Sequence, residues 1–290
     1  MSHAAARLPR FLHAPLRAAR TAALAALEPF DLLHRRLVGQ RGLPPLWLRR
    51  HVGPLGAFDR SVGEIAATIA LLELVHPGDT VLDLGCGVGA MVPDFQRFLG
   101  PHGRYVGFDV HAASIAWCRR RFAGDARLRF ELAPVRTTYS AGSEGDVLSY
   151  SFPVADASVD FALAKSLFTH LLEEEASHYL RELRRALRPD GRALVSAFLL
   201  DEASAERPKA EARTPNAPLY DFGFGTDRVR WLVRERPAAG VAFRRSVFVE
   251  LCVAAGLHVD RIVPGHWRGG ALAAPNAQDL VVLRAPAGSR

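Results

Sequence analysis

The sequence has few cysteines, almost no lysine and no long apolar run. The three cysteines, Cys86, Cys118 and Cys252, are odd in number and far apart, which favours reduced packing residues over disulfides or a metal site. Every strand-like stretch is interrupted by glycine, proline or a charged residue within about ten residues, too few for a membrane span. The sequence therefore predicts a cytoplasmic protein with no transmembrane segment and no bound metal.

Basic residues outnumber acidic ones, and nearly all of them are arginine. The 290 residues include 37 basic and 30 acidic ones, a net charge of +7, and the only lysines are Lys165 and Lys209. The arginines are scattered, with no run in which aromatic residues are interleaved. A high-GC genome explains this composition as well as DNA binding does, so we do not expect a nucleic acid as the partner.

An apolar strand expected at 80–84 runs directly into a glycine-rich turn. Asp83 lies near the end of this strand, and Gly85, Gly87 and Gly89 follow at alternate positions before helix-forming residues resume. Glycine removes side chains from a turn where a ligand must approach the backbone closely. The pattern therefore predicts a cradle for a nucleotide-type ligand.

A second buried strand, expected at 105–109, also ends in an acid, Asp109. Gly89 and Asp109 are 20 positions apart, which matches the step of about 20 residues to a ribose-binding acid. We therefore expect Asp109 to accept hydrogen bonds from both ribose hydroxyls. The alternative is that Asp109 caps the helix that begins near Ala112.

Strands and helices alternate along most of the chain, which predicts an α/β fold with a mainly parallel sheet. The remaining strands are expected at 128–132, 159–164, 192–200, 258–263 and 280–284, and the helices at 14–33, 65–75, 88–99, 113–122, 173–187 and 247–255.

The segment from Val81 to Ala90 resembles motif I of the class I S-adenosylmethionine-dependent methyltransferases, and its bacterial small-molecule branch in particular. Later segments at 152–161, 166–171 and 187–192 look like further motifs of the same superfamily, so the resemblance spans about Gly39 to Arg284. It implies a Rossmann-like, doubly wound, mostly parallel seven-stranded sheet whose last strand is antiparallel, and S-adenosyl-L-methionine as the cofactor. The spacing differs from the dinucleotide fingerprint G-x-G-x-x-G, because the third glycine comes one place early.

The resemblance also implies which residues contact the cofactor. They are expected to be Asp83, Gly85, Cys86, Gly87, Gly89, Asp109, Val110, Asp156 and Lys165. One position departs from the family pattern: many members have an acid or amide after the third strand to hold adenine, but here Ala133 and Pro134 stand there. Adenine contacts are then expected from Asp156, from the backbone or from the loop at 154–155.

Two histidines are candidates for a general base. Methyl transfer needs alignment above all, but a hydroxyl acceptor gains from a base with a pKa near neutral. His170 follows the strand at 159–164 and His266 follows the strand at 258–263; for each, the alternative is a hydrogen-bonded packing role. We expect a methyltransferase for a small molecule, with oxygen a better acceptor than nitrogen or carbon. The alternatives are a nicotinamide-dependent oxidoreductase and a catalytically silent cofactor-binding protein.

The chain is expected to divide near residue 60. Residues 61–290 would form the methyltransferase domain, with a substrate-side insertion at 201–243, and residues 1–60 a helical cap and connector. Within residues 1–50 only Glu28 and Asp31 are acidic, and apolar residues recur at helical spacing. A transit peptide and a helix in weak contact with a membrane surface are the alternatives to a cap over the cofactor site.

Overall fold

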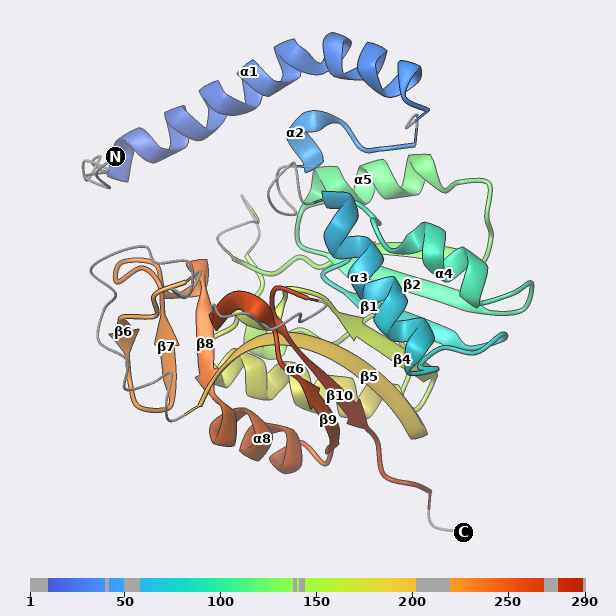
Figure 1. Ribbon diagram of the computed structural model, residues 1–290, viewed down its shortest axis with the longest axis vertical. Coiled ribbons are helices and arrows are strands. Elements are labelled where there is room, and N and C mark those ends of the chain that lie inside the picture. Colours follow the sequence, from blue (N-terminus) through green and yellow to red (C-terminus); the bar gives the residue numbers. More distant parts are fainter. Residues whose placement is uncertain are drawn as a thin grey trace. The chain divides into compact units, whose positions relative to one another are not determined.

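The computed structural model describes residues 10–39, 42–49, 58–137, 140, 144–201, 220–268 and 276–288. The chain forms two compact units, Met1–Asp59 and Arg60–Arg290. The first unit contains α1 (Arg10–Leu37) and the short α2 (Leu46–Arg49). Figure 1 shows that α1 is bowed, as expected for a helix with Pro29 in its interior, because proline removes a backbone donor. Among the described residues, no helix combines the length and apolarity that crossing a membrane requires.

The second unit is built on the mostly parallel sheet that the resemblance implied. Its seven central strands run in the order β3-β2-β1-β4-β5-β10-β9. The strands from β3 to β5 are parallel to their neighbours, and β10 is antiparallel to both β5 and β9. Their bounds are β1 (Thr80–Leu84), β2 (Arg104–Asp109), β3 (Leu128–Leu132), β4 (Val159–Ala164), β5 (Leu187–Leu200), β9 (His258–Val263) and β10 (Asp279–Arg284). The expected Rossmann-like sheet with an antiparallel last strand is confirmed.

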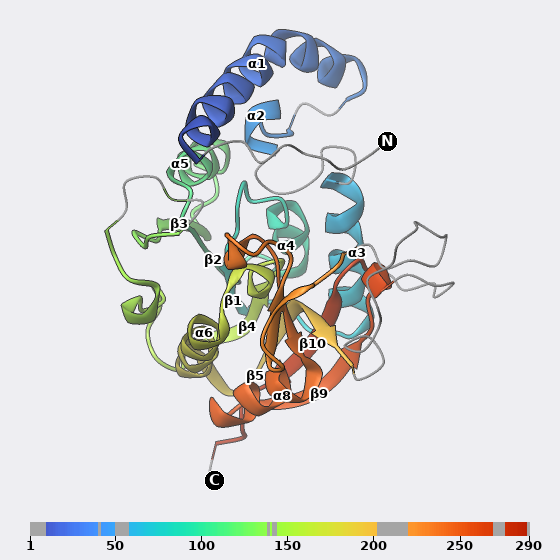
Figure 2. The same ribbon diagram turned by 90° about the vertical axis from the view of Figure 1, so that its left-hand side faces the viewer.

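Helices cover both faces of this sheet. α3 (Phe58–Leu71), α4 (Val92–Phe98) and α5 (Ala112–Arg121) pack on one face, and α6 (Glu173–Ala186) and α8 (Arg245–Ala254) pack on the other. Figure 2 shows α3 and α6 on opposite sides of the strands. Successive residues of β1 alternate between the two faces, with Val81 in the core beside α3 and Leu82 in the core beside α6.

α6 shows how local sequence sets one of these helices. Acidic residues fill its first turn and arginines its last, as the helix dipole favours. The Glu175 carboxylate accepts a hydrogen bond from the backbone N–H of Leu172 at 2.8 Å and so satisfies one of the donors at the helix start. Leu180 and Leu183 are fully buried against the sheet.

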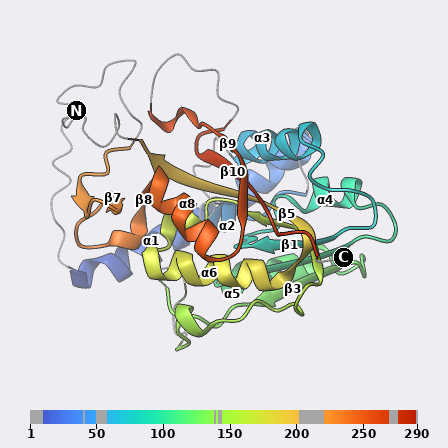
Figure 3. The ribbon, with the colours of Figure 1, turned by 90° about the horizontal axis from the view of Figure 1, so that it is seen from below.

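Three short strands extend the sheet in the region that the sequence predicted to be an irregular insertion. The last three residues of β5 pair with β8 (Val241–Arg244), which pairs with β7 (Val229–Trp231), which pairs with β6 (Phe224–Gly225). The described part of the sheet therefore has ten strands, not seven. Figure 3 shows β7 and β8 at one end of the sheet and β3 at the other. Residues 202–219 of the expected insertion lie outside the described residues.

Several element ends differ from the sequence prediction. The helix expected from residue 88 begins at Val92, because Gly89 is in the left-handed region at φ +70° and prolongs the turn. β5 begins at Leu187, five residues early, and Asp190 adopts φ +61° where the pairing with β4 is irregular. All three cysteines are buried and form no disulfide with one another, as packing residues would.

Candidate functional site

The glycine turn after β1 is tied to the end of β2. Gly85, Gly87 and Gly89 adopt φ +69°, +54° and +70°, values that side chains with a Cβ rarely adopt. The backbone N–H groups of Gly85 and Cys86 both donate to the carbonyl of Phe108, at 2.9 and 3.0 Å. Three left-handed residues in five therefore curl the chain around the carboxyl end of β2.

The outer two glycines serve different needs. A Cβ on Gly89 would lie 2.9 Å from the Phe122 ring and 3.2 Å from Cys118 Sγ, so this glycine lets the turn pack closely on α5. A Cβ on Gly85 would meet only Leu167, at an ordinary 3.5 Å. Gly85 is therefore required for its backbone conformation and Gly89 for packing as well.

Asp109 holds the centre of the glycine turn. Its Oδ2 accepts a hydrogen bond from the backbone N–H of Gly87 at 2.8 Å, and its Oδ1 accepts one from the N–H of His111 at 2.8 Å. The N-cap of α5 is His111, so Asp109 is not the helix cap that the sequence left open as an alternative. A carboxylate can accept about four hydrogen bonds, so ordering the turn is compatible with binding ribose hydroxyls.

The peptide of Gly87 is held from both sides. While its N–H donates to Asp109, its carbonyl oxygen accepts from Cys118 Sγ at 3.5 Å and faces Cys86 Sγ at 3.9 Å. Burial raises the pKa of both thiols, so Cys86 packs and orients the turn as a neutral thiol. Val110, the last expected neighbour of the turn, is partly buried against the core beside α6.

Asp83 is a buried carboxylate beneath this turn. It is 2% exposed, and its Oδ2 accepts a hydrogen bond from the Tyr105 hydroxyl at 2.7 Å. Burial raises its pKa to about 7, against the opposing effects of the Tyr105 hydrogen bond and the positive charge of Lys165. Burial likewise lowers the pKa of Lys165, while the negative charges of Asp83 and Glu64 raise it. Asp83, near the end of β1, and Lys165, directly after β4, therefore influence each other's pKa electrostatically.

Tyr105 is a site residue that sequence reasoning missed. Asp83 pairs in register with Gly107, and a Cβ on Gly107 would lie 2.8 Å from the Tyr105 hydroxyl. The tyrosine ring thus reaches over Gly107 to the carboxylate. A glycine inside a strand marks such a close approach, so Gly107 was the signal that could have revealed it.

His170 lies in a 3₁₀ turn, Phe168–His170, just after β4. Its Nδ1 is 2.9 Å from the carbonyl oxygen of Ala238. A carbonyl only accepts, so Nδ1 carries the proton and Nε2 carries the lone pair of the neutral ring. Burial lowers the pKa of His170, which favours this neutral form. The side chain therefore bridges β4 to the extension and also has the protonation state that a base requires.

His266 lies farther along the same edge of the sheet. It starts a 3₁₀ turn after β9, is half-buried, and its N–H donates to the carbonyl of Asn276 at 3.0 Å. β9 is separated from β4 by β5 and β10, whereas β4 pairs directly with β1. His170 is thus the histidine whose strand adjoins the glycine turn.

Asp156 is not brought together with the other expected cofactor residues. It precedes β4, at the amino end of the strand, whereas the glycine turn follows the carboxyl end of β1. Its exposed carboxylate pairs with Arg185 of α6 at 2.6 Å. This placement gives Asp156 a contact that fastens the loop before β4 to α6.

A polar cluster joins β4, β5 and β10 at their ends and was not anticipated from the sequence. Ser166 adopts φ +56°, and its backbone N–H donates to Ser196 Oγ at 2.7 Å. Both serine hydroxyls donate to Gln278 Oε1, at 3.0 and 2.6 Å. Left-handed serine is uncommon outside functional or tightly constrained turns, and these bonds hold it directly after Lys165.

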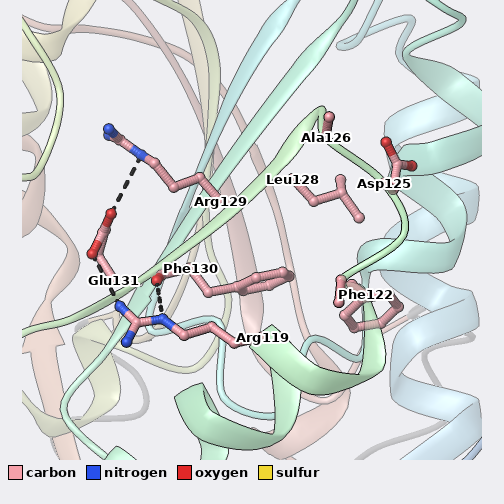
Figure 4. Close-up of a pocket in the computed structure, with 9 residues that line it drawn as sticks. Arg119, Phe122, Asp125, Ala126, Leu128, Arg129, Phe130 and Glu131 are labelled. Carbon is pink, nitrogen blue, oxygen red and sulfur yellow. Dashed lines mark hydrogen bonds and ion pairs between the residues drawn. The ribbon is translucent and has the colours of Figure 1, made fainter.

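A shallow pocket lies away from this site, against the outer side of β3 (Figure 4). Arg119 of α5 donates from Nε to the carbonyl of Phe130 at 2.8 Å and pairs with Glu131 at 3.1 Å. The pocket is lined by the end of α5, the following turn and β3, and its lining includes neither the three glycines of the turn nor Asp109. We therefore assign the pocket no part in cofactor binding.

Comparison with known proteins agrees with this geometry. A family profile described as "Methyltransferase domain" matches residues 82–195, from β1 to β5. Nocamycin O-methyltransferase of Saccharothrix syringae is 33% identical over 141 residues, which cover 47% of this chain and 45% of that protein. An uncharacterized 37.1 kDa protein in transposon TN4556 of Streptomyces fradiae is 28% identical over 136 residues, 47% of this chain and 35% of that protein.

A similar fold occurs in the mitomycin 7-O-methyltransferase MmcR. The TM-score is 0.52 at 20% sequence identity, and the match covers 88% of this chain and 60% of that one. This chain spans less than half the length of the two curated relatives above. The family profile covers the glycine turn and the strands from β1 to β5.

Proposed function

We propose that this protein transfers a methyl group to a hydroxyl of a small molecule. The chain belongs to the S-adenosylmethionine-dependent methyltransferases. S-adenosyl-L-methionine is the cofactor of this family. The observation that carries the proposal is the Gly87 peptide, which Asp109 holds at the point where β1 and β2 end side by side. The O-methyltransferase relative supports a small hydroxyl compound as the acceptor.

The residues at this edge fit the chemistry of the cofactor. Asp109 has acceptor capacity for a ribose diol, and the side-chain-free turn at Gly85 and Gly87 leaves room for a ligand beside the backbone. Asp83 and Lys165 supply one charge of each sign, as an amino acid group requires. When bound, the cofactor supplies an electrophilic methyl group on a positively charged sulfur.

The protein's own contribution is alignment and charge. Methyl transfer is an in-line displacement, so fixing the donor against the acceptor is the main source of rate. The carboxylate of Asp109 favours a cation at this edge, and Asp83 adds negative charge as the pH rises through its pKa of about 7. His170 would take the hydroxyl proton at Nε2, because Nδ1 is engaged with Ala238.

Titration calorimetry tests the proposal at the level of the cofactor. The protein is titrated separately with S-adenosylhomocysteine and with NAD. Binding of S-adenosylhomocysteine alone supports a methyltransferase, and binding of NAD alone would support the oxidoreductase alternative. A catalytically silent protein would bind S-adenosylhomocysteine but release none from S-adenosylmethionine across a panel of phenols and alcohols.

A further inference from the structure

One face of α1 is apolar and uncovered. Leu27, Phe30, Leu33 and Leu37 recur at spacings of three and four, which brings them to one side of a helix. They are 51, 72, 57 and 78% exposed, respectively. The large side chains of this face are therefore exposed.

The polar face of the same helix is the buried one. Arg35 is 3% exposed and pairs with both Glu28 and Asp31, and Asp31 also pairs with Arg49 of α2. The backbone N–H of Leu46, at the start of α2, donates to Glu28 Oε2 at 2.7 Å. A surface helix normally buries its apolar stripe and exposes its charges. α1 does the reverse, so its apolar face needs a cover that α2 does not provide.

The net charge of residues 1–59 indicates what kind of partner could cover this apolar face. Residues 1–59 contain nine arginines and three acids, so they carry +6 of the net charge of +7. Two of the three acids, Glu28 and Asp31, are already paired with arginine. A second copy of this unit would be repelled by its own positive charge, and residues 60–290 carry a net charge of only +1. An apolar helix face in a segment with a net charge of +6 is complementary to anionic lipid.

We propose that α1 lies on an anionic lipid surface, with Leu27, Phe30, Leu33 and Leu37 inserted among the acyl chains. A helix of 28 residues is about 42 Å long, enough to lie in the plane of the bilayer interface. The net positive charge of residues 1–59 would attract the lipid phosphates, and each basic residue near such a surface strengthens binding about fivefold. The surface would bring the catalytic unit to acceptors that dissolve in membranes.

Vesicle sedimentation of the full-length protein tests this. Vesicles of equimolar phosphatidylcholine and phosphatidylglycerol are expected to pellet the protein, and pure phosphatidylcholine vesicles to bind it at least tenfold more weakly. The double variant Phe30→Ser/Leu37→Ser should lose more than tenfold in partitioning. Leu71→Ser is the matched control, because Leu71 is 82% exposed on α3 and its loss should leave partitioning unchanged. Raising salt should weaken binding, since screening acts on exposed charges.

Four results would overturn the proposal. The first is an absence of pelleting with anionic vesicles, and the second is equal pelleting of the parent and the double variant. The third is a dimer in analytical ultracentrifugation that the double variant abolishes, which would make a second copy the cover. The fourth is a double variant whose vesicle binding equals that of the parent but whose affinity for S-adenosylhomocysteine is reduced in the absence of lipid. That result would make α1 a cap over the cofactor site. Circular dichroism melting confirms that the variants fold.

Discussion

The two sides of the sheet's carboxyl edge are built in different ways. On the donor side, at the ends of β1 and β2, Gly87 and Asp109 meet across 22 residues of one continuous βαβ segment. On the acceptor side, beyond β4 and β5, His170 bonds to Ala238 across 68 residues and Ser166 to Gln278 across 112. The donor side is thus a product of local sequence, and the acceptor side is assembled from distant segments. Changes to the first should alter cofactor affinity, and changes to the second should alter turnover.

Gly87→Val should have the largest effect. A branched side chain at φ +54° strains the backbone and fills the space beside the turn, so binding of S-adenosylhomocysteine should fall below detection by calorimetry. Gly124→Val is the control, because a Cβ on Gly124 meets nothing within 4 Å, and its affinity should equal that of the parent. An affinity within threefold of the parent for Gly87→Val would rule out the turn as the cofactor cradle.

His170→Asn separates catalysis from packing on the acceptor side. Asparagine can keep the donor to the Ala238 carbonyl but cannot accept a proton. If His170 is the base, turnover should fall about 10²- to 10⁴-fold at pH 7, while cofactor affinity and melting temperature stay near those of the parent. Release of S-adenosylhomocysteine in the presence of an acceptor hydroxyl compound is the measurement. Turnover of His170→Asn close to that of the parent would contradict the role as base. If His170→Gln also had a lowered melting temperature, the residue would be assigned to packing alone.

Asp83→Asn should stabilise the protein in a pH-dependent manner. Because burial raises the pKa of Asp83 from 3.8 to about 7, the folded state holds this proton more tightly than the unfolded state does. Ionisation of the buried carboxyl therefore lowers the free energy of unfolding. This loss is absent below pH 4, grows between pH 4 and 7, and is complete above pH 7. Asparagine has no such titration and can still accept from Tyr105. The advantage of the variant in free energy of unfolding should therefore grow by about 3 kcal/mol between pH 5 and pH 8.

The control for this measurement is Asp125→Asn. Hydrogen bonds from Arg127 and Gln96 lower the pKa of Asp125, so its carboxylate is ionised in both states throughout this range. Its effect should not vary with pH. Urea unfolding at four pH values checks both variants, and a constant difference for Asp83→Asn would mean that the carboxylate is not desolvated by the fold.

Asp109→Ala should weaken the binding of S-adenosylhomocysteine by about 1.5 to 3 kcal/mol, which lowers the affinity roughly 10- to 150-fold. The loss combines the ribose hydrogen bonds with the bond that orders Gly87. Asp109→Asn should fall between the parent and the alanine variant, since its amide oxygen retains one acceptor. Unchanged affinity with a lowered melting temperature would restrict Asp109 to holding the turn.

The sequence predicted the donor side in detail because the signals there are local. The bounds of β1, β3, β4 and β9 agree with the prediction to the residue. For β1 and β4 the signal is a largely apolar run ended by turn residues, which marks a buried parallel strand. The antiparallel direction of β10 came from the family resemblance and not from periodicity. Asp109 was identified from spacing alone, and the structure brings it to Gly87. The expected ligand roles at this turn remain predictions that the variants above test.

The rest depends on contacts that no local pattern encodes. β6, β7 and β8 are two, three and four residues long, too short for an alternating pattern, and they form only because the end of β5 offers a partner. Asp156 was grouped with the cofactor residues by its place in a motif, yet the direction of β4 puts it at the other end of the strand. The bond from His170 to Ala238 likewise arises only when the extension folds back.

Arg119 determines where this sheet can grow. β3 is the last strand on its side, and an exposed strand edge is a template for another chain. The Arg119 guanidinium donates a hydrogen bond to the carbonyl of Phe130 and pairs with Glu131 beside it. A further strand that used this carbonyl would have to displace the Arg119 side chain. In the opposite half, the last three residues of β5 pair with β8, and the sheet continues through β7 to β6. One end of the described sheet is thus shielded from further strands by a side chain, and the other end is lengthened by short strands.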